Sequence, residues 1–338
     1  MSGLAFKIWE LVCYCLIAIL GLVGNSLVCL VVLKNGPVFR RAPFNILIMS
    51  LAIADILLSL VAIPFYLLLT AIIPHPDGIA GTVLCKVSHT VPFWLAGVSI
   101  YLLVAISFER YEAVKDPLAA YTRSGFTKRT RFFIFGAWFI GFVIQLPTVI
   151  GIKYDSTDAK VGNCVYILSR NTRKIIYPFT FFAQFVIPAL IFIVNFIRIY
   201  KCMSLLGGNL RCHFSEGEVP KKILQRKKRT VKVIFTASLA FFICWTPNNT
   251  MYFLFQYFNK VAWNSDLYQI GVVLGFLNSC INPFLYAFQS ADFRENCLKI
   301  LRKATRRKAL GSSFTGSTSN GFFSDGYADT KKLITYAS

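Results

Sequence analysis

Seven long stretches of the chain are apolar and almost free of charged residues. Asp55 is the single Asp, Glu, Lys or Arg inside them, and the shortest stretch has 21 residues. About 20 apolar helical residues are enough to cross the hydrocarbon core of a bilayer. Because backbone N–H and C=O groups in lipid need partners within the protein, we predict a helix for each stretch. The stretches are residues 11–33, 42–74, 87–108, 132–152, 175–197, 233–259 and 267–291.

The composition agrees with a membrane protein. Hydrophobic residues make up 56% of the 338 residues and charged residues 15%, against roughly 45–50% and about 25% in average soluble domains. Strands of a membrane barrel would show alternating segments of about ten residues, and these stretches are longer and more uniform. The sequence therefore predicts an all-α membrane fold, a seven-transmembrane helix bundle over residues 11–291.

Basic residues are dense and sparse in alternating loops. Of the 36 Lys and Arg, 28 lie in the segments 34–41, 109–131, 198–232 and 292–338. Basic loops stay in the cytosol, so we predict a multi-pass plasma-membrane protein with a short extracellular N-terminus (residues 1–10) and a cytoplasmic C-terminus. The net charge of +21 then marks topology and an inner surface for anionic lipids or proteins, and no nucleic-acid partner is expected.

The pattern gives no sign of an enzyme. The three histidines, His75, His89 and His213, lie on different predicted elements and on two sides of the membrane, and no Ser/His/Asp set shares a depth. We expect no required cofactor. A seven-helix transporter or channel is an alternative from another class, but it needs several intramembrane charges or broken repeat helices, for which Asp55 alone is poor support.

Two of the ten cysteines lie in predicted extracellular loops. They are Cys85 and Cys164, whereas the others lie within spans or on the cytosolic side, where disulfides are rare. We predict one disulfide that ties the loop 151–174 to the top of the third helix. The alternative is two unpaired thiols in an oxidising compartment.

Several polar side chains share one depth in the predicted bilayer. At 1.5 Å per residue, Asp55, Ser99 and Asn278 all lie near the middle of their spans, and Asn282 lies one turn below Asn278. An isolated acid in the membrane indicates a functional site by default. The alternative is a protonated, hydrogen-bonded structural Asp.

Motifs in these stretches together resemble those of rhodopsin-like (class A) G-protein-coupled receptors. Each motif alone is weak, but all occur in order and at the right depth over residues 10–304, and Asn278–Pro283 is most similar to peptide-type receptors. The motifs are Gly24–Val28, Leu51–Asp55, Cys85, Glu109–Tyr111, Trp138, Pro188, Cys244–Pro247, Asn282–Tyr286 and Asp292–Arg294.

The resemblance implies roles for individual residues. A heterotrimeric G protein would meet Glu109, Arg110 and Tyr111, with Leu118 as an apolar loop contact, and a possible sodium ion would be an allosteric ligand. Without the surrounding motifs, Trp245 and Phe241 would be interpreted as ordinary core packing. The matched sodium set is Asp55, Ser99, Asn278, Ser279 and Asn282, and the matched activation set is Ile100, Pro188, Phe241, Trp245, Pro247, Pro283 and Tyr286.

The outer halves of the helices should line a ligand pocket rich in aromatic rings and amides. Pro92 stands where monoamine receptors carry an Asp, and the seventh stretch has no Lys for a retinal Schiff base. These two positions disfavour a monoamine and retinal. The resemblance of Asn278–Pro283 and of the aromatic pocket to peptide receptors implies a neuropeptide-like ligand, with a lipid or other non-amine small molecule as the alternative. His89 fits a packed structural histidine equally well. The candidates are Tyr66, His89, Pro92, Phe93, Tyr177, Phe181, Gln184, Trp245, Asn248, Asn249, Tyr252, Gln256, Gln269 and Phe276.

Three positions depart from the family pattern. Phe196 replaces a common Tyr, which puts a contact to Tyr286 in doubt. Lys227 replaces an acid that pairs with Arg110 in some members, so only Glu109 is left to hold Arg110 and some ligand-free activity is expected. The loop His75–Gly78 lacks the Trp often seen there.

The chain after the seventh stretch divides into two parts. Residues 292–308 place Phe293, Cys297, Ile300, Leu301 and Ala304 on one face among basic residues, which predicts an amphipathic cytoplasmic helix on membrane lipids. Cys297 is either a palmitoylation site or a small buried thiol. Residues 309–338 are rich in Ser, Thr and Gly, so we expect a disordered tail whose phosphorylation recruits arrestin.

Overall fold

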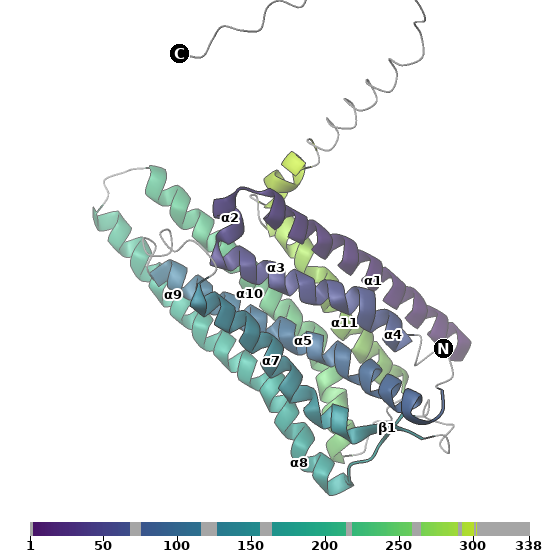
Figure 1. Ribbon diagram of the computed structural model, residues 1–338. Helices are drawn as coiled ribbons and strands as arrows, with labels where there is room; N and C mark the ends of the chain where they lie inside the picture. The colour runs from purple at the N-terminus through teal and green to yellow at the C-terminus, as the bar shows by residue number, and fades with distance from the viewer. Residues whose placement is uncertain are drawn as a thin grey trace, which may run out of the picture. The chain divides into compact units, whose positions relative to one another are not determined.

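The structure, a computed structural model, describes residues 3–67, 76–115, 127–155, 164–213, 218–258, 265–289, 293–300 and 302. Leu118 and residues 303–338 lie outside the described residues, as do the side chains of Lys227 and Gln256. Met1–Asn296 forms one compact unit. In its described part, seven helical spans are long and apolar enough to cross a membrane, which confirms the predicted bundle (Figure 1).

The seven spans run in chain order. The first is α1 (Gly3–Lys34), which the short α2 (Pro37–Arg41) joins to the second. The second is α3 (Pro43–Leu57) with the π-helical turn η1 (Leu58–Ala62) and α4 (Ile63–Leu67). The third and fourth are α5 (Gly78–Lys115) and α7 (Lys128–Gly151). The fifth combines α8 (Arg170–Phe181), the π-helical turn η3 (Phe182–Val186) and α9 (Ile187–His213). The last two are α10 (Glu218–Phe253) with η4 (Leu254–Phe258), and α11 (Asp266–Gln289).

Several helices extend beyond the apolar stretches that predicted them. α1 begins at Gly3 instead of residue 11, and α5 runs from Gly78 to Lys115 instead of 87–108. Charges mark where a chain leaves lipid, whereas a helix continues until a residue breaks it. Gly78 is such a residue, because its φ of 73° is disfavoured for residues with a Cβ.

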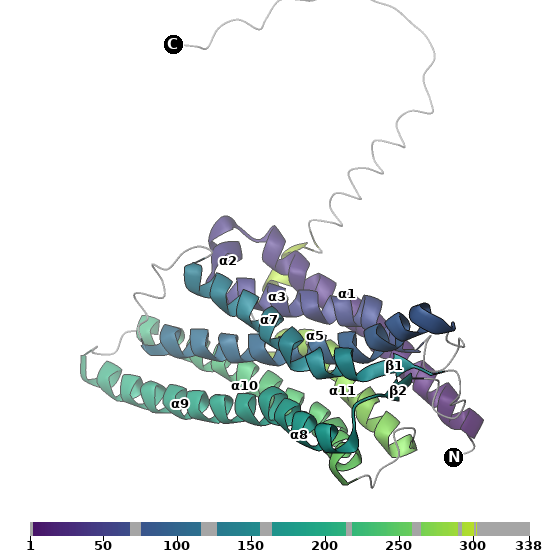
Figure 2. The same cartoon turned by 60° about the horizontal axis from the view of Figure 1, so that its bottom comes forward.

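A two-stranded antiparallel hairpin, absent from our prediction, follows α7. β1 (Ile152–Tyr154) pairs with β2 (Cys164–Tyr166) in the register Ile152↔Tyr166. Figures 1 and 2 show it at the end of the bundle where α1 and α8 begin. We call this the hairpin end, and the opposite one the Arg110 end.

Buried polar side chains connect the helices. Asn25 on α1 donates from Nδ2 to the carbonyls of Gly21 (2.9 Å) and of Ser279 on α11 (2.8 Å). Trp138 on α7 donates from Nε1 to Ser50 Oγ on α3 (3.3 Å). Such bonds satisfy polar groups that would otherwise face hydrocarbon.

The outer surface of the bundle is apolar. On α7, the phenyl rings of Phe132, Phe135 and Phe139 are 71%, 72% and 57% exposed. Soluble proteins seldom expose a continuous apolar face of this kind. The face fits contact with lipid.

Candidate functional site

A small cavity lies at the hairpin end, between α5, α7, α8, η3, β2 and α10. The volume that the centres of water molecules can occupy in it is about 50 Å³. Its wall contains eight of the residues proposed from the sequence together with four others. The lining residues are His89, Phe93, Gln145, Thr148, Tyr166, Thr180, Phe181, Gln184, Trp245, Asn248, Asn249 and Tyr252.

Five other sequence candidates do not line this cavity. Tyr66 and Phe276 are packed edge to face, 5.6 Å between ring centroids, and Tyr66 donates to Gln269 Oε1 at 3.2 Å. Tyr177 meets Tyr252 edge to face, with centroids 5.4 Å apart, and Pro92 is buried within α5. Helical phase turns these residues toward neighbouring helices, and a linear sequence does not fix that phase.

The cavity residues that we missed are Gln145, Thr148, Tyr166 and Thr180. Gln145 carried a usable signal, because it is an amide within an otherwise apolar stretch. Tyr166 carried none, since only the hairpin and the disulfide bring it over the helices.

Three elements are joined by amide groups beside the cavity. Gln145 on α7 donates from Nε2 to Gln184 Oε1 on η3 (2.7 Å), and Gln184 donates from Nε2 to the carbonyl of Phe93 on α5 (2.9 Å). The π-helical turn η3 sets the rotation of these side chains about the helix axis, so that Gln184 points inward while Phe182 is 51% exposed. Such turns occur often at functional sites.

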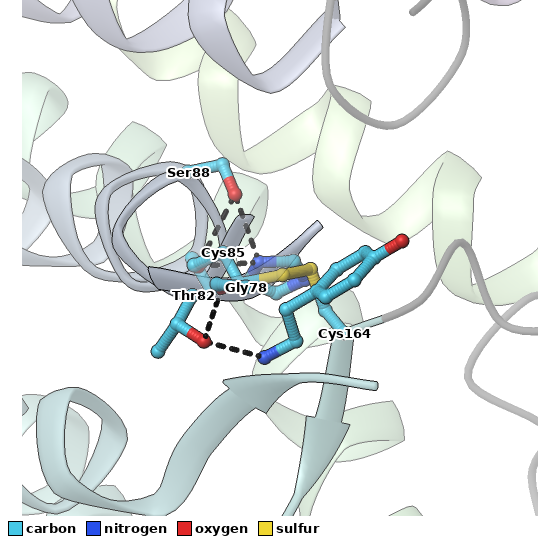
Figure 3. The surroundings of a disulfide bond; sticks show 7 residues. Gly78, Thr82, Cys85, Ser88 and Cys164 are labelled. Atoms are coloured by element: carbon cyan, nitrogen blue, oxygen red, sulfur yellow. Dashed lines mark hydrogen bonds between the residues drawn. A yellow bond between two sulfur atoms is a disulfide. The ribbon is translucent and has the colours of Figure 1, made fainter. Parts of the chain in front are cut away.

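The predicted disulfide is confirmed, and it holds the hairpin over the cavity. Cys85 on α5 is bonded to Cys164 on β2, with 5.6 Å between their Cα atoms (Figure 3). The Tyr154 amide of β1 also donates to Thr82 Oγ1 on α5 at 3.3 Å. These two links fix the hairpin to the start of α5.

Aromatic rings close the cavity on the side of the hairpin. The rings of Tyr166 and Tyr177 meet edge to face at 5.8 Å, and Tyr177 meets Tyr252 in the same way. Burial is the main cause that raises the pKa of the Tyr166 phenol well above its usual value. Tyr166 therefore stays neutral at physiological pH.

Trp245 lies beneath the cavity and is 3% exposed. Its indole meets the rings of Phe93 and Phe241, each at 6.1 Å between centroids. A Cβ on Gly275 of α11 would come within 3.0 Å of the indole, so a glycine permits this close approach. Phe241 and Ile100 are buried in the same core cluster, and Pro188 is buried on α9.

A polar cluster surrounds Asp55, which is 1% exposed. Ser99 donates from Oγ to Asp55 Oδ1 at 3.3 Å, and Asn282 donates from Nδ2 to Asp55 Oδ2 at 3.0 Å. Ser279 instead donates to the carbonyl of Phe276 in its own helix at 2.8 Å. The side-chain oxygens Asn278 Oδ1 and Asn282 Oδ1 are buried without hydrogen-bond partners.

Arg110 lies at the opposite end of α5. Its Nη2 is 3.6 Å from Glu109 Oε1, as expected, and its guanidinium carbon lies 3.9 Å from the ring centroid of Phe44. This cation–π contact with α3 was not anticipated. Tyr111 follows on the same helix and is partly buried.

Aromatic rings pack against Phe196 and Tyr286. Phe196 meets Phe192 at 5.9 Å and Phe235 of α10 at 5.0 Å between centroids. Tyr286 is 7% exposed and meets Phe293 at 6.1 Å. Pro247 and Pro283 both lie inside helices, α10 and α11, as predicted.

Comparison with known families decides which family this chain belongs to. The sequence profile described as "7 transmembrane receptor (rhodopsin family)" matches residues 24–286. The chain belongs to the rhodopsin family of seven-transmembrane receptors. Membership confirms the resemblance carried by the motifs, and it disfavours the transporter alternative. The receptor is accordingly a multi-pass membrane protein that couples to G proteins.

Named relatives of this receptor come from vertebrates and insects. Apelin receptor A from Danio rerio is 30% identical over 325 residues, which cover 89% of this chain and 85% of that receptor. Somatostatin receptor type 1 from Rattus norvegicus is 29% identical over 295 residues, covering 85% and 70%. Allatostatin-A receptor from Bombyx mori is 30% identical over 304 residues, covering 84% and 77%.

Proposed function

We propose that this receptor binds an extracellular peptide in the cavity at the hairpin end and activates a heterotrimeric G protein at the Arg110 end. The observation that carries the proposal is the cavity directly above Trp245, with aromatic and amide side chains in its wall. The names of the relatives, which include receptors for somatostatin and allatostatin-A, support a peptide over a lipid.

The orientation that this function requires follows from charge. The hairpin end carries the disulfide, and disulfides form in extracellular or other oxidising compartments. The Arg110 end carries most of the Lys and Arg, which favour the cytosol. We therefore place the hairpin end outside and the Arg110 end in the cytosol.

Packed side chains lead from the cavity into the buried core of the bundle. Phe93 in the cavity wall meets Trp245, and Trp245 meets Phe241 within the buried core that also includes Ile100. A ligand that displaces Trp245 would shift α10, because Pro247 removes one backbone hydrogen bond and makes that helix easier to bend.

The residues around Asp55 fit a sodium ion. Sodium binds oxygen ligands, and the cluster offers the Asp55 carboxylate together with the unpaired oxygens Asn278 Oδ1 and Asn282 Oδ1. When bound, the ion would supply a positive charge that balances the buried carboxylate. Ser99 would orient Asp55 through its present hydrogen bond.

The end of the chain supports two further partners. Residues 293–300 are helical, and the i, i+4, i+7 spacing of Phe293, Cys297 and Ile300 supports contact of an apolar face with lipid. The Ser and Thr residues after Gly311 would be phosphorylated, and arrestin would bind the phosphorylated tail.

A cell-based G-protein reporter tests the proposed function. We expect peptides from a synthetic neuropeptide library to activate the wild-type receptor and to leave Arg110→Ala silent at equal surface expression. Activation only by a lipid panel would replace the peptide with the alternative ligand. Substrate flux without any G-protein response would overturn the proposal.

A further inference from the structure

The described wall of the ligand cavity carries no Asp, Glu, Lys or Arg. His89 is its one basic side chain, and its Nδ1 lies 3.0 Å from the carbonyl oxygen of Cys85. A ring nitrogen that close to a carbonyl is the protonated one, so this contact is satisfied with a neutral imidazole. Because the described wall has no carboxylate, ammonium or guanidinium group, a charged ligand group would lose its hydration there without gaining such a counter-charge.

Hydrogen-bond accounting shows what the cavity offers instead. The amides of Gln145, Gln184 and Asn249 donate to protein oxygens, the last to the Trp245 carbonyl at 2.9 Å. Two donors remain without partners: Trp245 Nε1 and Asn248 Nδ2, both on side chains that are 3% exposed. A buried donor without a partner has lost its hydration without gaining a hydrogen bond, so a ligand that brings an acceptor removes this cost.

The size of the cavity limits what can enter. A volume of about 50 Å³ corresponds to roughly four water molecules on the scale where one water needs about 10–15 Å³. A single side chain or chain end fits, whereas a whole peptide does not. Phe93, Phe181 and Tyr252 supply aromatic surface for an apolar part of that end.

We propose that the part of the ligand that enters the cavity is uncharged and carries a carboxamide whose oxygen accepts hydrogen bonds from Trp245 and Asn248. Because only a side chain or chain end of a peptide fits the cavity, main-chain carbonyls are excluded, and the uncharged carbonyl acceptors that remain are the carboxamides of an amidated C-terminus and of an Asn or Gln side chain. The proposal rests on the proposed function, because it specifies the ligand of the same cavity.

Arg173 presents the main rival. Arg173 does not line the cavity, but its guanidinium carbon lies 6.0 Å from the ring centroid of Tyr166, which does. A peptide with a free carboxylate could pair with Arg173 at the mouth and leave the cavity to another group. The experiment must therefore separate binding in the cavity from binding at Arg173.

Thermal unfolding of the purified full-length receptor with three small probes makes this separation. N-acetyl-phenylalaninamide carries a terminal carboxamide, N-acetyl-phenylalanine carries a carboxylate, and N-acetyl-glutamine N-methylamide carries the primary carboxamide in its side chain. We expect either carboxamide probe to raise the melting temperature with an apparent Kd at least about tenfold lower than that of the acid, since one unpaired group is worth about that factor. The tighter of the two carboxamides identifies the source.

Three variants locate the binding. Asn248→Leu should reduce the preference for the carboxamide about tenfold, with Asn248→Ala in its place if that variant does not fold. The control Gln269→Leu removes an amide outside the cavity wall and should leave the preference unchanged. Equal or tighter binding of the acid overturns the proposal, and so does acid binding that is lost in Arg173→Gln or the absence of any stabilisation by the carboxamides. These readouts need no G protein, so they are independent of whether a peptide agonist activates the receptor.

Discussion

Asn195 on α9 donates a hydrogen bond from Nδ2 to Ser107 Oγ on α5, with 2.9 Å between the atoms. Both side chains are buried, at 1% and 0% exposure, and Ser107 in turn donates to the carbonyl of Val104 at 2.7 Å. The pair lies one helical turn from Arg110 along α5. It is a polar link between the third and fifth spans, next to the position where Phe196 replaces the family's tyrosine.

This link should hold α9 against α5 in the present state. Asn195→Leu and Ser107→Ala are each expected to destabilise the receptor by about 0.5–1.5 kcal/mol, and the double variant by less than the sum, because the two side chains share one bond. Thermal unfolding measures the cycle. Ser238→Ala is the control, since Ser238 donates only within its own helix, to Ile234, at 2.8 Å. Strict additivity would contradict the coupling.

Sodium should stabilise the receptor through Asp55. Replacing potassium chloride with sodium chloride at constant ionic strength is expected to raise the melting temperature of the wild type, because an ion that binds only the folded state stabilises it. Asp55→Ala should abolish the difference. Ser59→Ala should retain it, since Ser59 bonds only the Asp55 backbone carbonyl, at 2.8 Å. A sodium effect that survives Asp55→Ala would exclude this site.

Arg110 should be required for signalling, and Lys227 should set the ligand-free level. Arg110→Ala at equal surface expression is expected to abolish G-protein activation, whereas the control Arg129→Ala, which removes an ion pair with Glu112 at 3.6 Å, should signal normally. Lys227→Glu should lower ligand-free activity, because an acid there can pair with Arg110. Full signalling by Arg110→Ala, measured in a reporter assay, would refute the assignment.

Loss of the disulfide should release the hairpin from the cavity. Replacing both Cys85 and Cys164 with Ala is expected to cost about 2–4 kcal/mol of stability and to increase hydrogen exchange of the amides in β1 and β2. Cys13→Ala removes an unbonded cysteine and serves as the control. Unchanged exchange in the hairpin would mean that its contact with Thr82 suffices.

Cys297 should carry a lipid. It lies on the same helical face as Phe293 and Ile300, which we place against the membrane. Metabolic labelling with a palmitate analogue is expected to mark the wild type, and Cys297→Ala should remove the label. Label that persists would assign the modification to another cysteine, such as Cys202.

The sequence alone determined the class of fold, the family resemblance and the disulfide. Stretches without charge are sufficient for this, because lipid excludes unpaired backbone groups and permits only helices over such lengths. Asp55 stood out as the one Asp, Glu, Lys or Arg in the seven apolar stretches, and Cys85 and Cys164 stood out as the two cysteines in predicted extracellular loops. The motifs that contain Arg110, Trp245 and Asn282 are recognised from the linear sequence, without knowledge of how the helices pack.

The tertiary structure decided which side chains meet. The phase of each helix, including the extra residue in the π-helical turn at Gln184, turned Phe276 and Tyr66 into the core and brought Gln145 to the cavity. The hairpin placed Tyr166 over it, through pairing between strands that carry no strong local signal. Asn195 and Ser107 are 88 residues apart in the chain. Their bond depends on the relative rotation of two helices, and rotation is a property of packing that no local pattern encodes.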